Sequence, residues 1–318
     1  MGRRPRASGL DGILLVDKPS GWTSHDVVNK LRRATGQPRI GHTGTLDPAA
    51  TGLLVVCLGA ATRLVEYMTA HHKRYTGDIV LGATTTTDDA EGEVISSAPV
   101  PDISEAALHA LEAAFSGDLQ QVPPSYSAIH IDGQRAYAAA RSGKVVELAP
   151  RPVRIDRLLL SQVAPDRLRL ELECGPGTYV RSLARDIGAA LGCGGHLASL
   201  RRTRAGRFDV EEADTLSDLI EAITLGLLER VILRFDDGIL EMPAALVGAP
   251  AAAQLVMGQL PEVDIIREGA GPVRVFSSAG DFVGIAHPQG TELGACLRPA
   301  KILASRAPAN EAAEARLA

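Results

Sequence analysis

Apolar and polar residues alternate in short blocks along the first two thirds of the chain. Apolar runs bounded by glycine, proline or charged residues are typical of buried strands. Residues 168–174, LRLELEC, alternate instead between apolar and charged positions, which is the pattern of a strand with one face in water. The strands predicted from these patterns span residues 12–16, 53–58, 75–81, 154–160 and 168–174.

Helices are predicted where apolar residues recur at helical spacing, in most cases behind a capping side chain. The segment 37–52 holds too many glycines and prolines for regular structure. The predicted helices run from the cap Ser24 to Gly36, over residues 60–69, onward from Ser104, from the cap Thr178 to Leu191, and from the cap Thr215 to about Arg230.

The pattern changes after residue 240 to short strands, at residues 273–276 and 282–285, separated by glycine-containing turns. This change predicts a small β-rich domain behind a larger domain of mixed α and β structure. We place the first domain at residues 1–239 and the second at residues 240–303. Residues 304–318 are rich in alanine and charge, and we expect a disordered tail there.

The composition is that of an ordinary globular protein, with 318 residues, 45% of them hydrophobic and 22% charged. No apolar stretch reaches the about 18 residues of a membrane span, so we expect a soluble protein without a membrane partner. The four cysteines form no C-x-x-C pair, and His71–His72 has no thiol or carboxylate at ligand spacing. We therefore expect no metal and a reducing cytoplasm.

Charge is segregated along the chain, although the formal net charge is only −5. Residues 1–75 and 131–210 each carry a net charge of +6, whereas residues 76–130 carry −9 and residues 211–318 carry −8. If the two basic segments meet in the fold, they form a positive face suited to a phosphate backbone. Solvated charge without a partner is the equal alternative.

A glycine-rich loop at residues 41–52 contains the best candidate for chemistry, Asp47. Its glycines permit unusual backbone conformations, and Pro48 stiffens the chain directly after the carboxylate. A carboxylate presented in a fixed direction suits a nucleophile or a base. The alternative is a turn in which Asp47 bonds its own backbone, and the residues alone leave both open.

Several blocks together resemble the tRNA pseudouridine-55 synthases, the TruB family. The resemblance covers about residues 10–230, and its blocks occur in the family's order. The matching blocks are DKPSGWTS (17–24), GHTGTLDP (41–48), ATGLL (50–54), KRY (73–75), PSYSA (124–128), GTYVR (177–181), LGCGGH (191–196) and LRR (200–202).

The resemblance implies isomerisation of a T-loop uridine in tRNA, without metal or cofactor. The N-glycosidic bond breaks, the base turns within the site, and a carbon–carbon bond to the ribose forms. Asp47 matches the family's essential aspartate, proposed either to attack the ribose C1′ or to take the C2′ proton, and both routes need it ionised. Arg181 matches its partner, since a guanidinium stays charged and can bind both carboxylate oxygens. Apart from the motif, Arg181 would be a surface residue.

Five further positions match the family's pocket. Tyr75 matches the catalytic tyrosine that stacks on the target base and has been proposed to assist removal of the C5 proton; a core tyrosine is the compatible alternative. His42 matches a histidine implicated in nucleotide flipping, and otherwise is a polar loop residue. Asp89, Tyr179 and Leu200 match substrate-binding positions, for which solvated charge, helix packing and core packing are the alternatives.

The family fold is α+β, a large and mostly antiparallel mixed sheet with the active-site cleft across its middle. Residues 271–275 and 280–286 resemble the PUA-type RNA-binding domain that follows the catalytic domain in this family. The implied partner is the T-stem-loop of tRNA, with no obligate protein partner, and we expect a monomer. His130 stands where some members carry a lysine, so no phosphate contact is assigned to it.

Two other functions remain open at this point. One is a non-catalytic RNA-binding or RNA-folding protein on the same scaffold. The other is a pseudouridine synthase that acts on a different RNA, such as the catalytic subunit of a guide-RNA particle. The chain lacks long basic extensions of the kind that recruit partner proteins, which argues against the guided enzyme.

Overall fold

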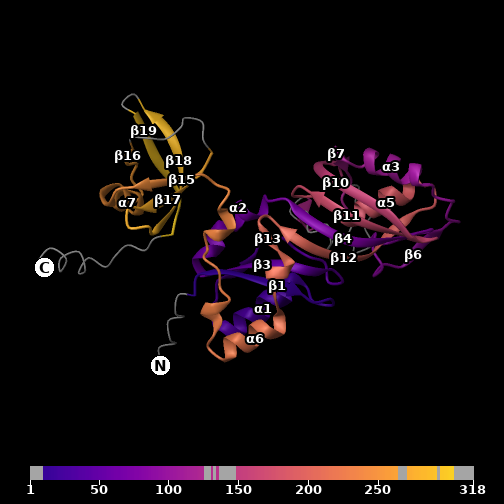
Figure 1. Ribbon diagram of the computed structural model, residues 1–318, viewed down its shortest axis with the longest axis horizontal. Helices are drawn as coiled ribbons and strands as arrows, with labels where there is room; N and C mark the ends of the chain where they lie inside the picture. Colours follow the sequence, from indigo (N-terminus) through magenta and orange to yellow (C-terminus); the bar gives the residue numbers. More distant parts are fainter. Residues whose placement is uncertain are drawn as a thin grey trace, which may run out of the picture. The chain divides into compact units, whose positions relative to one another are not determined.

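The computed structural model describes residues 10–124, 130–131, 134–135, 148–263, 271–291 and 294–303. The chain forms two compact units (Figure 1). The first comprises residues 1–59 and 65–233, and the second residues 60–64 and 234–318. The predicted tail, most of the PSYSA block and the His130 side chain lie outside the described residues.

A ten-stranded mixed sheet organises the first unit. Its main path follows the order β14-β1-β3-β12-β4-β11-β10-β7, while β2 pairs with β3 and β13 with β12. The pairs β1–β14 and β3–β12 are parallel and the others antiparallel, as the family fold predicts. The strands are β1 (Gly12–Lys18), β2 (Ile40–His42), β3 (Thr51–Leu58), β4 (Lys73–Leu81), β7 (Gly117–Gln121), β10 (Arg151–Ala164), β11 (Arg167–Cys174), β12 (Gly195–Ala205), β13 (Phe208–Asp209) and β14 (Asp214–Thr215).

Helices and two short hairpins complete the first unit (Figure 1). The helices are α1 (Ser24–Thr35), α2 (Val65–Thr69), α3 (Glu105–Ala114), α5 (Val180–Ala190) and α6 (Leu216–Thr224), with 3₁₀ turns η2 (Val210–Glu212) and η3 (Leu228–Arg230). A further 3₁₀ turn, η1 (Gly59–Leu64), lies almost entirely in the second unit. The hairpins pair β5 (Ala83–Thr85) with β6 (Val94–Ser97), and β8 (His130–Ile131) with β9 (Gln134–Arg135). Helices α1 and α6 share one apolar core with β1 and β3. Helices α3 and α5 share another with β4, β10 and β11.

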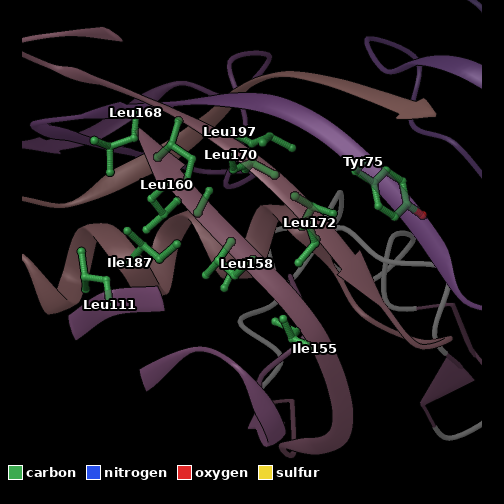
Figure 2. Close-up of a cluster of buried hydrophobic side chains, with 14 of the residues drawn as sticks. Tyr75, Leu111, Ile155, Leu158, Leu160, Leu168, Leu170, Leu172, Ile187 and Leu197 are labelled. Atoms are coloured by element: carbon green, nitrogen blue, oxygen red, sulfur yellow. The ribbon is translucent and has the colours of Figure 1, made fainter. Parts of the chain in front are cut away.

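The second of these cores confirms the predicted alternation in residues 168–174. Leu168, Leu170 and Leu172 are buried, while the charged residues between them are exposed or half-buried. Figure 2 shows these leucines in one cluster with Ile187 of α5, and Tyr75 of β4 at the margin of that cluster. The sheet thus has one face packed against the core and one face in solvent, and Tyr75 lies on the packed face.

The predicted cap of α1 is wrong by one residue, with a consequence for the site. Thr23 is the N-cap, and its hydroxyl and the Asp26 carboxylate each accept the other's backbone N–H. Ser24 lies inside the helix and is buried. Its hydroxyl accepts the N–H of Leu46 (2.8 Å) and contacts the carbonyl oxygen of the same residue (3.2 Å). Ser24 therefore holds the loop that carries Asp47.

Three further predictions of local structure need correction. Thr178 caps no helix: its hydroxyl donates to the Gly175 carbonyl, and α5 begins two residues later. Helix α6 does start at the predicted cap Thr215, but it ends at Thr224 because the chain turns at Gly226 with φ +70°. The glycine-rich segment 37–52 contains strand β2, which pairs with β3 at the edge of the loop.

The second unit confirms a β-rich carboxy-terminal domain. Its five-stranded sheet has the order β15-β17-β18-β19-β16. It has a core of its own, in which Leu255 of the helix packs with Val275 and Leu297 of the sheet. The elements are η4 (Asp237–Ile239), β15 (Ala244–Val247), α7 (Ala249–Val256), β16 (Glu262–Val263), β17 (Val273–Ser277), β18 (Phe282–Thr291) and β19 (Gly294–Ile302). Within the described ranges, no helix is long and apolar enough to cross a membrane.

Strands β3 and β12 approach each other unusually closely at Gly52. This residue has φ +96°, and a Cβ atom there would lie 2.3 Å from the carbonyl oxygen of Arg202. No side chain fits at that distance, so only glycine permits the parallel pairing of Gly52 with Arg202. The contact joins the strand that follows Asp47 to the strand opposite Tyr75.

We expect Gly52→Ala to lower the free energy of unfolding by at least about 2 kcal/mol, because backbone strain and the clash with Arg202 add. The matched control is Gly21→Ala, where φ is +82° but no atom lies within 4 Å of the added Cβ. That variant should lose only the left-handed strain, about 1 kcal/mol. Urea denaturation of both proteins measures the difference, and equal losses would contradict the role given to the close approach.

Candidate active site

The Asp47 loop (residues 43–50) connects β2 to β3. Hydrogen bonds from the turn after β1 hold it in place. The ammonium of Lys18 donates to the carbonyl oxygen of Pro48 (3.1 Å) and to two carbonyls of its own turn. The Gly21 N–H donates to the same Pro48 oxygen (2.9 Å). Lys18 is completely buried, and burial lowers its pKa to about 8 although the nearby Asp47 raises it. This lysine thus anchors the residue next to Asp47.

Arg181, at the start of α5, binds Asp47 through two separate contacts. Its Nε lies 3.0 Å from Oδ2 and its Nη2 lies 3.2 Å from Oδ1 of the carboxylate. The remaining nitrogen, Nη1, donates to the carbonyl oxygen of Thr87 (3.0 Å) and lies 3.5 Å from Asp89 Oδ2. The Arg181 side chain is 7% exposed, so it is not the surface residue that its position alone would suggest.

The carboxylate of Asp47 is held between opposing electrostatic effects. About 40% of the side chain is open to solvent, yet the surrounding walls remove enough water to raise its pKa. Arg181 opposes this increase, Asp89 adds to it, and Lys18 opposes it more weakly. Without the guanidinium, the carboxylate would protonate more readily. The bidentate pair therefore both orients Asp47 and favours its ionised form.

Tyr75 belongs to β4, the strand between β11 and β12 in the sheet, and lies on the face that packs into the apolar core. It is 8% exposed and belongs to the apolar core, while its side chain also lines the site. Burial raises the pKa of its hydroxyl, and the neighbouring Arg202 guanidinium opposes that increase. Tyr75 is therefore a core residue whose side chain also lines the cavity, so the two interpretations made from sequence are compatible. A ring packed on one side presents a fixed surface on the other.

Arg202 of β12 is almost fully buried and binds backbone carbonyls around the Asp47 loop. Its Nε donates to Leu53 (2.7 Å), its Nη2 to Gly44 (3.1 Å) and its Nη1 to Thr45 (3.4 Å). One side chain thus joins the loop before Asp47 to the strand after it. Since Arg202 is also opposite Tyr75 in the sheet, it sets the loop against the ring.

These groups surround a cavity of about 390 Å³. Its lining includes predicted site residues from four separate parts of the chain, namely Asp47, Tyr75, Tyr179 with Arg181, and Leu200. Its remaining charged lining residues are Lys73 and Arg202. Tyr179 is the N-cap of α5, where the Gln121 side-chain amide receives its N–H (2.8 Å) and donates to its carbonyl oxygen (3.1 Å).

The other two predicted residues, Asp89 and His42, lie outside this lining. Asp89 stands behind Arg181, and its Oδ1 accepts the Thr87 hydroxyl and the Glu91 N–H (3.1 Å), so it is a bound carboxylate rather than a solvated one. His42 ends β2, and its Nδ1 is buried without a hydrogen-bond partner in the described part of the chain. Burial lowers the His42 pKa, which favours the neutral ring.

Three cations of the site were not assigned a role from sequence: Lys18, Lys73 and Arg202. Lys73 donates to the carbonyls of Thr69 (3.0 Å) and His71 (2.7 Å), and burial lowers its pKa to about 8, assisted by Arg202. A usable signal existed for Lys73, because residues two apart on a strand share a face and Tyr75 follows it at that spacing. Lys18 and Arg202 lie in the family-like blocks, but their carbonyl partners come from distant segments.

The arrangement offers an oriented carboxylate, whose ionised form Arg181 favours, and an aromatic ring within one cavity. Such a carboxylate can act as a nucleophile or accept a proton, and the ring can hold a planar group beside it. Among the residues the structure describes, no cluster of His, Cys, Asp or Glu could hold a metal ion. His72, part of the pair considered from sequence, contacts Asp156 at 2.6 Å.

Sequence comparison finds two family models that together match residues 32–238. Residues 32–180 match the model of the TruB family pseudouridylate synthase (N terminal domain), and residues 181–238 match the tRNA pseudouridylate synthase B C-terminal domain. The tRNA pseudouridine synthase B of Thermobifida fusca is 45% identical over 87% of this chain and 94% of that protein. The protein of the same name from Mycobacterium tuberculosis is 43% identical over 91% and 96% of the two chains.

Solved structures agree on the fold. A chain in the crystal structure of a Cbf5-Nop10-Gar1 complex has a TM-score of 0.71 at 24% identity, covering 93% of this chain and 85% of that one. At this identity the likeness concerns the fold. The sequence relatives decide the family, because they share more than 40% of aligned residues along almost their whole length. The chain belongs to the TruB family of pseudouridine synthases.

Proposed function

We propose that this protein is a tRNA pseudouridine synthase that isomerises uridine 55 in the T-loop. The observation that carries the proposal is the bidentate Asp47–Arg181 pair in a cavity that Tyr75 also lines. The relatives at 43–45% identity are named tRNA pseudouridine synthase B, which supports tRNA as the substrate. In this proposal the chain itself supplies every reacting group.

Asp47 supplies the reacting carboxylate in the proposed mechanism. It either adds to C1′ as the N1–C1′ bond breaks, or removes the C2′ proton so that the base leaves. The detached uracil then turns within the site. In the first route its C5 attacks C1′ and displaces the Asp47 carboxylate; in the second its C5 bonds to C1′ while Asp47 returns the proton to C2′. In both routes C5 then loses its proton and N1 gains one. The product is an isomer of the substrate. Arg181 favours the ionised form of Asp47 before the reaction and orients the carboxylate toward the ribose.

The neighbouring residues hold the base and the distorted RNA. The Tyr75 ring stacks on the uracil, an interaction worth about 1–3 kcal/mol per base, and Leu200 supports the base from β12. His42 fills the gap that the extruded nucleotide leaves, and its unpartnered Nδ1 then gains a partner from the RNA. Asp89 fixes the far side of the Arg181 guanidinium.

We further propose a monomer in the cytoplasm that needs no protein partner and no cofactor. All four cysteines are buried free thiols, which suits a reducing compartment. The second unit serves as a PUA-like RNA-binding domain in this proposal. A guide-RNA enzyme is the second candidate, favoured only by the fold shared with the Cbf5 complexes, and a purely RNA-binding protein would leave the ionised Asp47 without a use.

We expect Asp47→Asn to abolish pseudouridine formation while leaving tRNA binding within about twofold. The amide keeps the shape of the carboxylate but cannot act as nucleophile or base, so the rate should fall by about 10³-fold or more. Pseudouridine in an unmodified tRNA transcript is mapped by chemical modification and primer extension, without added metal. A transcript with cytidine at position 55 is the control.

Other outcomes of that experiment decide among the candidate functions. Modification of bare tRNA by the native protein would exclude dependence on a guide RNA. Tight binding without any product would support the RNA-binding protein instead. Product formation by the Asp47→Asn protein would contradict the proposed role of the carboxylate.

We expect Arg181→Gln to move the acid limb of the pH–rate profile upward by about 1–2 pH units. Burial raises the Asp47 pKa and Arg181 lowers it, so removing the guanidinium lets that pKa rise further, and ionised Asp47 is lost at a higher pH. Arg185→Gln, one turn later on α5, is the control because it pairs with Asp88 and Asp186. The measurement is the single-turnover rate against pH, and an unshifted limb would refute the electrostatic role.

We expect tRNA affinity to fall steeply as salt rises, despite the net charge of −5. The cations Lys73, Arg181 and Arg202 line the cavity, and the two basic segments belong to the first unit except for residues 60–64. Filter binding of the Asp47→Asn protein at 50–300 mM salt gives the slope without turnover. A flat dependence would defeat the proposed basic face.

A further inference from the structure

A second and larger cavity, of about 630 Å³, opens in the first unit and has no part in the proposed reaction. The turn after β1 lines it, together with α1, β12 and the beginning of α6. The indole of Trp22 is 36% exposed in this lining, beside the apolar side chains of Pro19 and Ile220. An aromatic surface left open in a chain with only 3% aromatic residues is a feature that core packing does not explain.

The charge of this cavity favours an anion. Its charged lining residues are three cations, Lys18, Lys30 and Arg201, and one carboxylate, Asp17. Arg201 neutralises Asp17 through two hydrogen bonds of 3.0 and 2.7 Å, and the Lys18 ammonium is turned toward carbonyls. Lys30 is exposed, and no hydrogen bond or ion pair engages it within the described segments. The cavity therefore combines an open indole with an available ammonium.

The second cavity adjoins the Asp47 loop. Thr51, four residues after Asp47, lines it, as does Pro19. The next residue, Ser20, donates to the carbonyl oxygen of Ala49 (3.2 Å), and Lys18 bridges from this lining to Pro48. The turn that carries Trp22 and the loop that carries Asp47 are therefore joined by direct hydrogen bonds.

We propose that this cavity binds a second, unpaired nucleotide of the RNA substrate, with its base stacked on Trp22 and a phosphate near Lys30. The proposal rests on the proposed function for the nature of the substrate. Base stacking on an aromatic ring tolerates any sequence, and an ammonium suits a phosphate. Thr51 and Ser217 also line the cavity, and their hydroxyls can bond to a base edge or a ribose hydroxyl. A peptide occupant lacks the anionic backbone that this lining matches.

Trp22 is the single tryptophan of the chain, so intrinsic fluorescence reports on this cavity alone. The test titrates the full-length Asp47→Asn protein with a T-stem-loop RNA while filter binding measures the same complex. We expect tryptophan quenching that saturates at the concentration where binding does. Tight binding without quenching would overturn the proposal.

Variants separate a specific subsite from general attraction. Stacking worth about 1–3 kcal/mol predicts that Trp22→Ala raises the RNA Kd by about 5- to 150-fold, and Trp22→Phe by less. The Lys18 contact is to the Trp22 backbone carbonyl, which both variants keep. Lys30→Gln should weaken binding several-fold more than Arg33→Gln, which lies on the same helix outside the cavity.

The outcomes distinguish this proposal from the proposed function. If the native protein forms pseudouridine but Trp22→Phe and Lys30→Gln bind RNA as the native protein does, the second subsite is absent and the function stands. If the native protein forms no pseudouridine, the proposed function itself fails. A larger effect of the variants on KM than on kcat supports a binding role, and an effect on kcat alone would overturn it.

Discussion

The bidentate ion pair between Asp47 and Arg181 is the interaction on which the site depends. Its partners lie 134 residues apart in the chain, so the pair forms only when the Asp47 loop and α5 are both in place. A buried arginine without an acidic partner is costly, and Arg181 is satisfied by two carboxylates and a carbonyl. The same contacts thus join distant parts of the fold and favour the ionised form of the Asp47 carboxylate.

Strand β12 brings the remaining parts of the site together. It pairs with β3 at Gly52 and with β4 at Tyr75, so it joins the strand after the Asp47 loop to the aromatic ring. Side chains alternate along it, and Arg202 faces the active-site cavity while Arg201 faces the second cavity. Two adjacent arginines therefore serve different cavities, one by binding loop carbonyls and the other by neutralising Asp17.

The sequence predicted those features that depend on local pattern or on a long motif. Alternation predicts the strand at residues 168–174, and the family blocks identify Asp47, Arg181 and Tyr75. Contacts between distant carbonyls and buried cations could not be predicted in this way, because a backbone carbonyl carries no sequence signal that identifies it as a partner. Lys18 and Arg202 belong to this class. The cap of α1 was misplaced for a related reason, since the buried partner of Ser24 lies 22 residues away.

The lowered pKa values of two lysines limit the conditions under which the site is fully charged. Lys18 and Lys73 each have a pKa of about 8, because burial disfavours their charged form. Both are therefore cationic at neutral pH and lose their protons as the pH rises above that value. Asp47 behaves oppositely, and its raised pKa means that it loses its charge as the pH falls. An ionised Asp47 beside cationic Lys18 and Lys73 exists only between these limits. Within that range the cations favour both the ionised carboxylate and the approach of a polyanionic substrate. Loss of a lysine charge above the range, or of the Asp47 charge below it, would weaken these interactions.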